Sequence, residues 1–352
     1  THNRSCRLFA DPLDPDESPM TVFEFSSDTS ARMTSLDWQH DLTPASGRRG
    51  RVVAGVEIRK ESGDSFDPDS GFVSFDESYT VGSFYAHGQL KSPEGILAAR
   101  DLLVMNLGFR LDHYEQFGNQ ANPKLSLVYR LPQRGIKLHA AYGTGFKAPS
   151  ISDIALPFWG NPDIKPEESR SWEVGIAKSF KEKKVDLELV YFNNRFTNLI
   201  AADPVLYIAS NIASARSEGM EVQLRAHPVD SLWFLASYTY LNSEDKLTGL
   251  ELLRRPKHKG GFTVNVIPLT GLSLNIDGTV RGKMRDFDVA GLPPDNEGYF
   301  KLDLHAAYRL QKKAHGVSMF ARIENLLNAD FMEIQGYPAP GFNIHGGMRL
   351  SF

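Results

Sequence analysis

The sequence predicts an all-β fold, an antiparallel up-and-down β-barrel of about sixteen strands that crosses a membrane. Three observations predict it: apolar and polar residues alternate along most of the chain, short and long connections follow one another in turn, and a helical periodicity is hard to find. The 352 residues, 41% of them apolar and 23% charged, are typical of a folded protein. The net charge of −4, without a basic half, argues against a nucleic-acid partner.

Apolar runs exclude a membrane-spanning helix but not a membrane. The longest runs, such as 232–236, are far shorter than the roughly 18 residues that such a helix needs. A transmembrane β-strand needs only about 9–11 residues, and its apolar residues alternate with polar residues instead of forming a continuous run. The alternating segments here have about 10–13 residues, whereas strands of soluble sandwiches usually have about 5–6. Their length therefore favours a transmembrane barrel.

The alternation is clearest over residues 300–310. Phe300, Leu302 and the other even positions are apolar and fall on one face. Lys301, Asp303 and the other odd positions fall on the opposite face, which is mostly ionic. Three further segments separate in the same way: 185–191, 220–226 and 348–352. Each strand is therefore expected to present one face to hydrocarbon and the other to water.

The connections predict an up-and-down meander. The predicted strands are roughly 2–9, 31–42, 49–60, 79–90, 100–112, 122–131, 135–145, 170–180, 184–194, 211–226, 231–242, 258–268, 271–283, 298–310, 316–327 and 342–352. Short turns are expected at 132–135, 181–184, 227–230, 268–271 and 311–315, and long loops at 61–78, 145–169, 243–257, 284–297 and 328–341. Because one short connection strictly follows one long connection, all long loops should lie at one rim.

Aromatic residues fall near the ends of the predicted strands. They include Phe180, Tyr191, Phe192, Trp233, Tyr238, Tyr240, Phe262, Tyr299, Phe300, Phe320 and Phe352. This placement suits two interfacial girdles around a lipid-facing band. A position in the core of a soluble sandwich is the alternative for any one of them.

Several sequence strings go beyond pattern. Residues 142–150 read YGTGFKAPS, and residues 161–169 read NPDIKPEES, followed by WEVG at 172–175. The first string resembles the segment of TonB-dependent outer-membrane receptors in which a strand rises into a long loop, and the second resembles the descent from that loop. Further strings similar to this family lie at 191–200, 211, 217–221, 237–240, 253–256, 324–328 and 336–341. The terminal Phe352 resembles the signal by which such barrels are recognised for insertion.

The resemblance covers about residues 30–352 and implies the C-terminal barrel portion of a receptor in the bacterial outer membrane. Arg254 and Arg255 before Pro256, together with 337–341, look most like the cobalamin and siderophore receptor branch, although Phe342 stands where an arginine is commoner. Such receptors are similar to 22-stranded barrels filled by an N-terminal plug. We therefore expect residues 1–352 to form one barrel domain without the plug and the first strands.

Lipid does not tolerate an unpaired strand edge. The predicted strands should therefore either close on themselves into a smaller barrel or pair with strands outside this chain. The sequence leaves both outcomes open.

The resemblance implies a transporter for a metal chelate such as a siderophore or cobalamin. Its partners would be outer-membrane lipid, the protein's own plug and a TonB-type energising protein. Chain length favours a passive porin-like channel of about sixteen strands instead, and a surface-binding or structural barrel is a third reading. An enzyme is not expected, because the sequence contains no G-x-S-x-G, H-E-x-x-H or P-loop motif.

Two groups of side chains are candidates for contact with a ligand. Exposed aromatic and polar residues in long loops can form a concave site; they are Phe158, Trp159, Tyr207, Arg285, Asp286 and Tyr337. Loop packing is the alternative for Phe158 and Trp159, and a rim girdle position for Tyr337. Polar residues on the water-facing side are expected to line the lumen in cross-strand pairs; they are Asp186, Glu188, Glu221, Arg225, Lys301, Asp303, His305 and Arg309.

No cofactor is predicted, and calcium in acidic loops is the one metal that the residue types suit. The acidic groups are Asp11, Asp14, Asp16 and Glu17, and Asp64, Asp67, Asp69, Asp76 and Glu77. Neither group has the spacing of a calcium loop, and simple solvation is the alternative. Cys6 is the only cysteine, so an internal disulfide is excluded.

Overall fold

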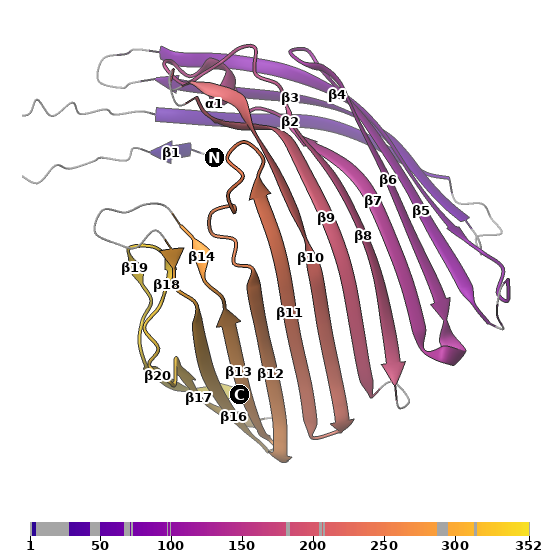
Figure 1. Cartoon of the computed structure of the whole chain (residues 1–352), viewed down its shortest axis with the longest axis vertical. Helices are drawn as coiled ribbons and strands as arrows, with labels where there is room; N and C mark the ends of the chain where they lie inside the picture. Colours follow the sequence, from indigo (N-terminus) through magenta and orange to yellow (C-terminus); the bar gives the residue numbers. More distant parts are fainter. Residues whose placement is uncertain are drawn as a thin grey trace, which may run out of the picture.

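A single curved antiparallel sheet of sixteen strands dominates the computed structural model of the protein (Figure 1). The structure describes residues 2–4, 28–42, 50–66, 71, 73–96, 98, 100–180, 184–203, 206, 208–286, 295–312 and 315–351. Every strand of the sheet pairs with its neighbours in chain order. The up-and-down all-β fold predicted from alternation is confirmed.

The strands run from the N-terminal to the C-terminal side of the sheet. The first eight are β1 (His2–Arg4), β2 (Asp28–Asp41), β3 (Gly50–Phe66), β4 (Val73–Lys91), β5 (Leu102–Tyr114), β6 (Gly118–Leu131), β7 (Ile136–Lys147) and β8 (Glu167–Phe180). The others are β9 (Val185–Ala202), β10 (Ala209–Val229), β11 (Leu232–Asp245), β12 (His258–Leu269), β13 (Leu272–Arg281), β16 (Tyr299–Lys312), β17 (His315–Glu324) and β20 (Asn343–Ser351).

The connections hold the remaining elements and distinguish the two ends of the strands. They are η1 (Pro132–Arg134), α1 (Ile151–Ala155), β14 (Met284–Arg285), β15 (Asp295–Asn296), β18 (Met332–Ile334) and β19 (Tyr337–Pro338). We call the end that carries α1, β14, β15, β18 and β19 the loop rim, and the opposite end the turn rim (Figure 1). No helix among the described residues is long and apolar enough to cross a bilayer.

Two predicted connections at the loop rim are wrong. The loop expected at 61–78 is largely strand, because β3 and β4 stay paired as far as Phe66 and Val73. The strict alternation of short and long connections also fails, because β5 and β6 are joined by a tight turn between Tyr114 and Gly118, where Gly118 has φ +73°. The outward positions of this hairpin, which include Ser62, Asp64 and Asp76, are polar, so alternation of apolar and polar residues no longer marks the strands.

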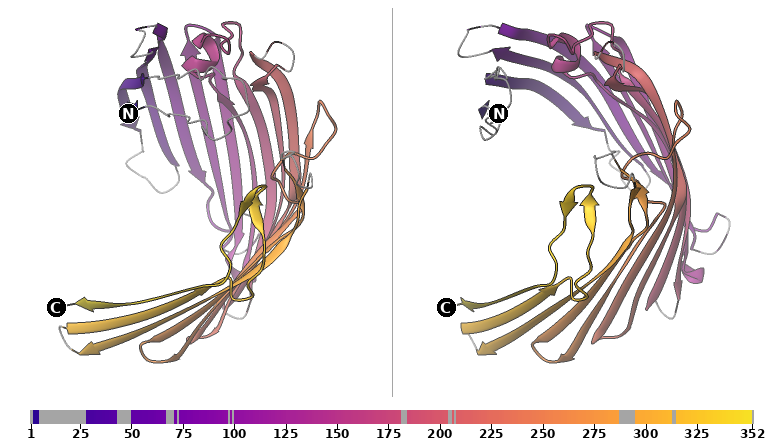
Figure 2. Two further views of the ribbon diagram at one scale, coloured as in Figure 1. Left: turned by 90° about the vertical axis from the view of Figure 1, so that its left-hand side faces the viewer. Right: turned by 60° about the vertical axis from the view of Figure 1, so that its left-hand side comes forward.

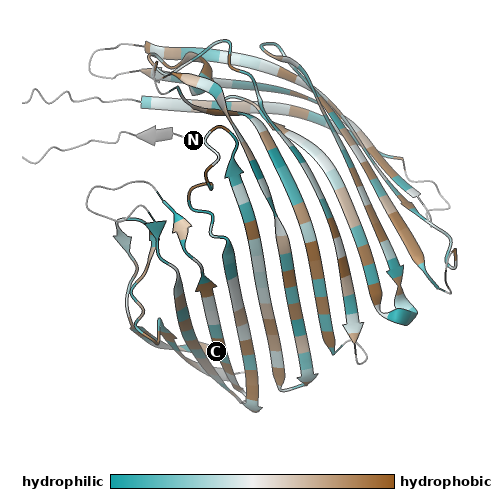
Figure 3. Ribbon diagram, in the orientation of Figure 1, coloured by the Kyte–Doolittle hydropathy of each residue, from teal (hydrophilic) through white to brown (hydrophobic). Residues whose placement is uncertain are grey.

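The register sorts side chains onto two faces. Val264, Ile276 and Leu304 are successive cross-strand partners on one face. Thr263, Asp277 and Asp303 occupy the adjacent rung and therefore the other face. The apolar side chains are not buried within the chain, and Figure 3 shows them alternating with polar residues along the strands. This pattern fits an outer face that contacts hydrocarbon and an inner face that contacts water.

The sheet does not close. β1 and β20 form its two ends and are not paired with each other, and Figure 2 shows them on the two sides of one wide opening. Of the two outcomes that the sequence left open, closure of the strands into a smaller barrel is therefore not observed. Since barrel diameter grows with strand number, a sheet that is still open after sixteen strands has the curvature of a wider barrel.

A small core lies at the loop rim between β4, β5 and α1. Tyr79, Val81 and Tyr114 are buried, with relative exposures of 4%, 0% and 4%. The side chains packed against them are Phe117, Phe146, Ala148 and Ile151. This core holds the loop that contains α1 against the sheet.

Glycine allows large side chains to lie across neighbouring strands. A Cβ atom on Gly55 would overlap the Tyr85 ring and would lie 2.8 Å from the carbonyl oxygen of Trp38. A Cβ atom on Gly175 would likewise overlap the His139 ring. Tyr85 and His139 therefore lie flat on the polar face, beside the side chains described below.

The substitution Ile276→Arg tests the assignment of the two faces. An arginine near the middle of a lipid-facing strand should lower the free energy of unfolding by about 2–4 kcal/mol. Asn275→Arg, on the other face of the same strand, should change it by less than about 1 kcal/mol. Urea unfolding of the intact protein in phospholipid vesicles measures both values, and equal losses would contradict the assignment.

Candidate functional site

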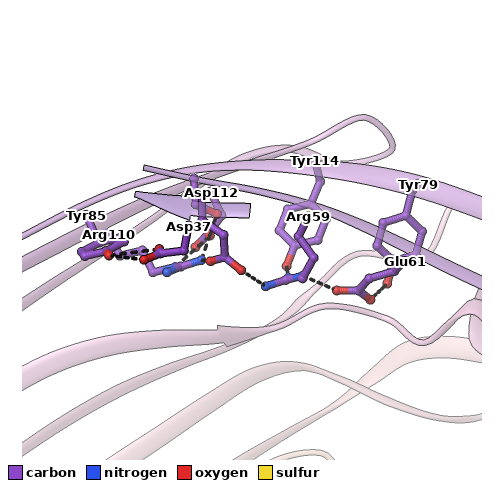
Figure 4. Close-up of polar contacts among 10 residues, drawn as sticks. Asp37, Arg59, Glu61, Tyr79, Tyr85, Arg110, Asp112 and Tyr114 are labelled. Atoms are coloured by element: carbon purple, nitrogen blue, oxygen red, sulfur yellow. Dashed lines mark hydrogen bonds and ion pairs between the residues drawn. The ribbon is translucent and has the colours of Figure 1, made fainter. Parts of the chain in front are cut away.

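A continuous series of polar contacts crosses four neighbouring strands, β2 to β5, on the polar face. Its members are Asp37, Glu57, Arg59, Glu61, Tyr79, Ser83, Tyr85, Arg110, Asp112 and Tyr114. They occupy alternate positions of their strands and so point to the same side of the sheet, its concave side (Figure 4). We call this series the polar ladder.

Arg110 is the centre of one half of the polar ladder. Its Nη2 atom donates to Glu57 Oε2 at 2.7 Å and to Ser83 Oγ at 2.9 Å. Its Nε atom donates to Asp112 Oδ1 at 2.8 Å, and Ser83 donates to the same carboxylate oxygen at 2.6 Å. Arg110 also lies 5.8 Å from the centre of the Tyr85 ring, and the Tyr85 hydroxyl donates to Asp37. One guanidinium therefore ties together strands β3, β4 and β5.

Arg59 is the centre of the other half. Its Nε atom donates to Glu61 Oε1 at 2.6 Å, and Tyr79 donates its hydroxyl proton to Glu61 Oε2 at 2.6 Å. Arg59 also contacts Glu57 at 3.4 Å and donates to the Tyr114 hydroxyl at 3.3 Å. Because Tyr79 and Tyr114 belong to the small core, the ladder and the core support each other.

The polar ladder is shielded although it faces the concave side. The side chains of Asp112, Glu57 and Arg59 are 3%, 15% and 19% exposed. Shielded charges interact more strongly than exposed ones, so removal of one partner leaves a costly unpaired charge. The polar ladder contains four carboxylates and two guanidinium groups, which gives it a negative balance of charge.

A cavity of about 560 Å³ lies beside the ladder. Its walls include Tyr85, His87, Arg110, Asn122 and Lys124. These side chains supply several hydrogen-bond donors around one concave surface. The cavity can therefore accept a polar group from a segment or molecule that fills the concave side.

Sequence analysis missed the polar ladder. It placed Glu61 in a loop and sought wall residues only in the second half of the chain. The available signal was the spacing of two residues between Glu57, Arg59 and Glu61, repeated between Arg110 and Asp112. Ionic residues at that spacing share one face of a strand.

The eight predicted wall residues all fall on the face that carries the polar ladder, as the strand register shows. Lys137 donates to Glu188 at 2.8 Å, and Arg225 lies directly opposite Asp186. His305 Nε2 lies 3.7 Å from Asp277 Oδ2. They lie on this face because they occupy alternate positions of their strands, as the sequence pattern predicted. A contact of these residues with a ligand stays a prediction.

Asp303 has a structural contact that the sequence did not indicate. Its side chain forms an ion pair with Lys301 at 2.9 Å and accepts a hydrogen bond from the Asn325 backbone at 2.8 Å. Asn325 is 2% exposed and adopts φ +51°. Its side chain forms hydrogen bonds with both ends of the loop that follows, at Ala329 and at Pro340. Asp303 therefore secures the base of the loop between β17 and β20.

Phe158 and Trp159 have different environments. The indole Nε1 of Trp159 donates to Asp153 Oδ1 at 3.1 Å, and its backbone carbonyl accepts from Ala209 at 2.7 Å. Trp159 thus fastens the loop that contains α1 to the first residue of β10. Phe158 adopts φ +66° and is 97% exposed. Trp159 therefore anchors the loop, whereas the Phe158 side chain faces solvent.

Asp286 joins three loops. Its side chain is fully buried and accepts from Arg254 Nε at 2.6 Å and from the Gln335 backbone at 2.9 Å. Arg285 donates to the Glu251 carbonyl at 2.7 Å. These two predicted ligand residues therefore hold loops together in this structure, because each has its partners within the chain.

Arg281 provides a second junction at the loop rim. Its guanidinium donates to the carbonyl of Met332 at 2.6 Å and to Asn296 Oδ1 at 2.8 Å, and it lies 4.8 Å from the centre of the Tyr299 ring. Sequence analysis missed Arg281 because it ends an otherwise ordinary strand. Tyr337, in contrast, is 73% exposed. Of the other predicted ligand residues, Tyr207 lies outside the described residues.

The acidic groups considered for calcium lie only partly within the described residues. Asp64 and Asp76 are cross-strand partners on β3 and β4, and Ser30 donates to Asp64. Glu77 is also in a strand. Asp67, Asp69 and the group at 11–17 lie outside the described residues. No group of three or more metal-binding side chains is close enough to hold an ion in the part of the chain that the structure describes.

Comparison with known proteins identifies relatives of the whole sheet. A family model described as TonB dependent receptor-like, beta-barrel matches residues 5–326. The vitamin B12 transporter BtuB of Photobacterium profundum is 26% identical over 235 residues, which are 65% of this chain and 37% of the transporter. The matched part of the chain thus covers well under half the length of this curated relative.

Solved structures show the same architecture. The ferric enterobactin receptor PfeA from Pseudomonas aeruginosa superposes with a TM-score of 0.74 at 20% identity, covering 96% of this chain and 55% of the receptor. The siderophore receptor PirA from Acinetobacter baumannii superposes with a TM-score of 0.74 at 18% identity, covering 100% and 59%. At such identities the likeness establishes the fold alone.

Arg110→Leu tests whether the polar ladder stabilises the sheet. The substitution leaves the shielded Glu57 and Asp112 carboxylates without a main partner, so the free energy of unfolding should fall by about 2–4 kcal/mol. The control is Arg51→Leu, which removes an ion pair to Asp41 whose side chains are 63% and 43% exposed. This control should cost less than about 1 kcal/mol. Urea unfolding compares them, and equal costs would refute the role of shielding.

Asp153 gives the loop that contains α1 a dependence on pH. Burial raises the pKa of Asp153, but hydrogen bonds from Ser150 and Trp159 outweigh burial and hold this pKa below its ordinary value. The carboxylate therefore stabilises the loop above about pH 4, and the stabilisation is lost as pH falls through the lowered pKa. Trp159 fluorescence, with the other tryptophans replaced by phenylalanine, should change below about pH 4. Asp153→Asn should abolish that change, and persistence of the change would contradict the assignment.

Proposed function

Since the chain belongs to the TonB-dependent receptor family, we propose that it supplies most of the barrel of an outer-membrane receptor that takes up a metal chelate, such as a siderophore or cobalamin. One observation carries the proposal. The sheet has a polar concave face, and the long loops lie together at one rim above it, joined by contacts such as that of Arg254 with Asp286. A receptor needs both parts, because a ligand must first be captured outside and then pass along a hydrated surface.

The capture surface in this proposal consists of exposed aromatic side chains on anchored loops. Phe158 is displayed by a loop that Trp159 and Asp153 fasten, and Tyr337 is displayed by β19 next to the Asp286 junction. Anchored loops lose little conformational freedom when they bind, which favours affinity. Tyr207 remains a proposed member of this surface. Arg285 and Asp286 contribute by holding the loops in place.

The relatives support a metal chelate as the class of ligand. The printed names of the matched proteins are a vitamin B12 transporter, a ferric enterobactin receptor and a siderophore receptor. Vitamin B12 and ferric siderophores are both metal complexes in an organic ligand. The relatives are transporters and receptors, and we accordingly propose a function in transport without catalysis.

The proposal includes partners outside the described sheet. Further strands would pair with the open edges at β1 and β20, because lipid does not tolerate unpaired backbone groups. A plug would fill the concave side, where the eight wall residues and the cavity beside the polar ladder would contact it. A TonB-type protein would supply the energy for release. A passive channel of sixteen strands has less support, because it requires the closure that the sheet does not show.

A binding titration tests this function. The intact protein in detergent should show saturable quenching of tryptophan fluorescence with at least one member of a panel of ferric siderophores and corrinoids at micromolar concentration. Phe158→Ala should weaken that binding about tenfold, because exposed aromatic anchors contribute strongly to affinity. Leu247→Ala, at another exposed apolar loop residue (70%), is the matched control and should change it little. Failure of every chelate to bind would overturn the proposal.

A further inference from the structure

Three arginines form one rung across the outer, apolar face of the sheet. In the strand register Arg170 of β8 lies opposite Arg195 of β9, and Arg195 lies opposite Arg216 of β10. Each has the same parity as the apolar residues of its strand, such as Trp172 and Met220, so all three side chains belong to the outer face. Cross-strand partners are only about 4.5–5.5 Å apart at Cβ. We call this rung the arginine row.

The level of the arginine row is that of a membrane interface. One rung nearer the turn rim lies Trp172, and Tyr191 follows it with its ring centre 5.4 Å away, so an aromatic belt adjoins the row. Below this belt the outer face of β8 is apolar as far as Phe180 at the turn rim, apart from Lys178 beside that rim. Ten residues separate Arg170 from Phe180, which is about 33 Å along a strand and roughly 25 Å of depth for a tilted one. That depth equals the apolar band of an outer-membrane barrel.

Acidic neighbours compensate only one arginine of the row. Arg216 forms an ion pair with Glu218 at 2.6 Å, and the same carboxylate accepts from Tyr191 and Asn193 at 3.0 Å each. Glu244, the partner of Arg216 on β11, pairs with Lys246 at 2.6 Å.

The other two guanidinium groups remain available. Arg170 and Arg195 are exposed and make no ion pair or hydrogen bond with the residues that the structure describes. The one further acid on this part of the outer face is Glu168, one rung nearer the loop rim and opposite Thr197. Like charges directly opposite each other destabilise a sheet. An anion bound from outside the described residues would relieve this repulsion.

We propose that Arg170 and Arg195 form a docking site for the phosphorylated headgroup of an anionic lipid in the outer leaflet. Two guanidinium groups on neighbouring strands can bind one phosphate group bidentately, beside the neutral ion pair of Arg216 and Glu218. The apolar face below accepts the acyl chains while the aromatic belt marks the boundary. A lipid meets all of these surfaces at once, whereas a free phosphate ion meets only the arginines. The site is separate from the concave wall and does not depend on which chelate is transported.

Lipid titration with detection by native mass spectrometry tests the site. The intact protein in detergent is titrated with bisphosphorylated lipid A, with the dephosphorylated lipid of the same acyl chains, and with inorganic phosphate. The bisphosphorylated lipid should bind preferentially, and Arg170→Gln combined with Arg195→Gln should weaken it at least about tenfold, because charge-assisted hydrogen bonds are lost. Glu168→Gln should strengthen binding, because it removes the nearby negative charge.

A matched control removes two arginines elsewhere. Arg100→Gln combined with Arg134→Gln changes exposed residues in connections at the turn rim and should leave lipid binding unchanged. Chelate titration of the same variants shows that they are folded and separates this site from the proposed transport function. Equal loss in both double variants, equal binding of the dephosphorylated lipid, or equally tight binding of inorganic phosphate would each overturn the proposal.

Discussion

Backbone hydrogen bonding between strands is the constraint on which the structure depends. Inside hydrocarbon every amide and carbonyl needs a partner from the chain, so each strand is extended and its side chains alternate between two environments. The polar ladder, the arginine row and the apolar band all follow from the parity of residue numbers along a strand. A shift of one residue in register would exchange lipid-facing and water-facing sets. The paired register therefore determines both the fold and the location of the polar ladder and the arginine row.

The wall uses shielded charge where a soluble protein would use an apolar core. Arg59 and Arg110 each bridge several strands, and their carboxylate partners are themselves hydrogen-bonded by hydroxyl groups. These hydrogen bonds are needed because the free-energy cost of removing a charge from water is offset only when its partners are well placed. The glycine residues beneath Tyr85 and His139 keep bulky rings flat. The result is a stiff polar surface suited to contact with a mobile segment or a passing ligand.

Alternation of residues was enough to predict the fold and the face of all eight wall residues, because parity needs no knowledge of distant contacts. It failed for the hairpin of β3 and β4, whose outward positions Ser62, Asp64 and Asp76 are polar, so that apolar and polar residues no longer alternate. It also could not reveal that Asp286 is buried, because its partners Arg254 and Gln335 come from loops 32 and 49 residues away along the chain. Loop contacts of this kind depend on three-dimensional arrangement, which no local pattern encodes.

The junction at Asp286 connects the loops in the second half of the loop rim to one another. Arg254, Asp286 and Gln335 belong to three successive loops, and Arg281 adds a tie to the last of them. A displacement imposed on one loop is therefore transmitted to its neighbours. A peptide epitope grafted at the exposed turn around Leu247 would leave this assembly intact, whereas one grafted beside Arg254 would loosen three loops together.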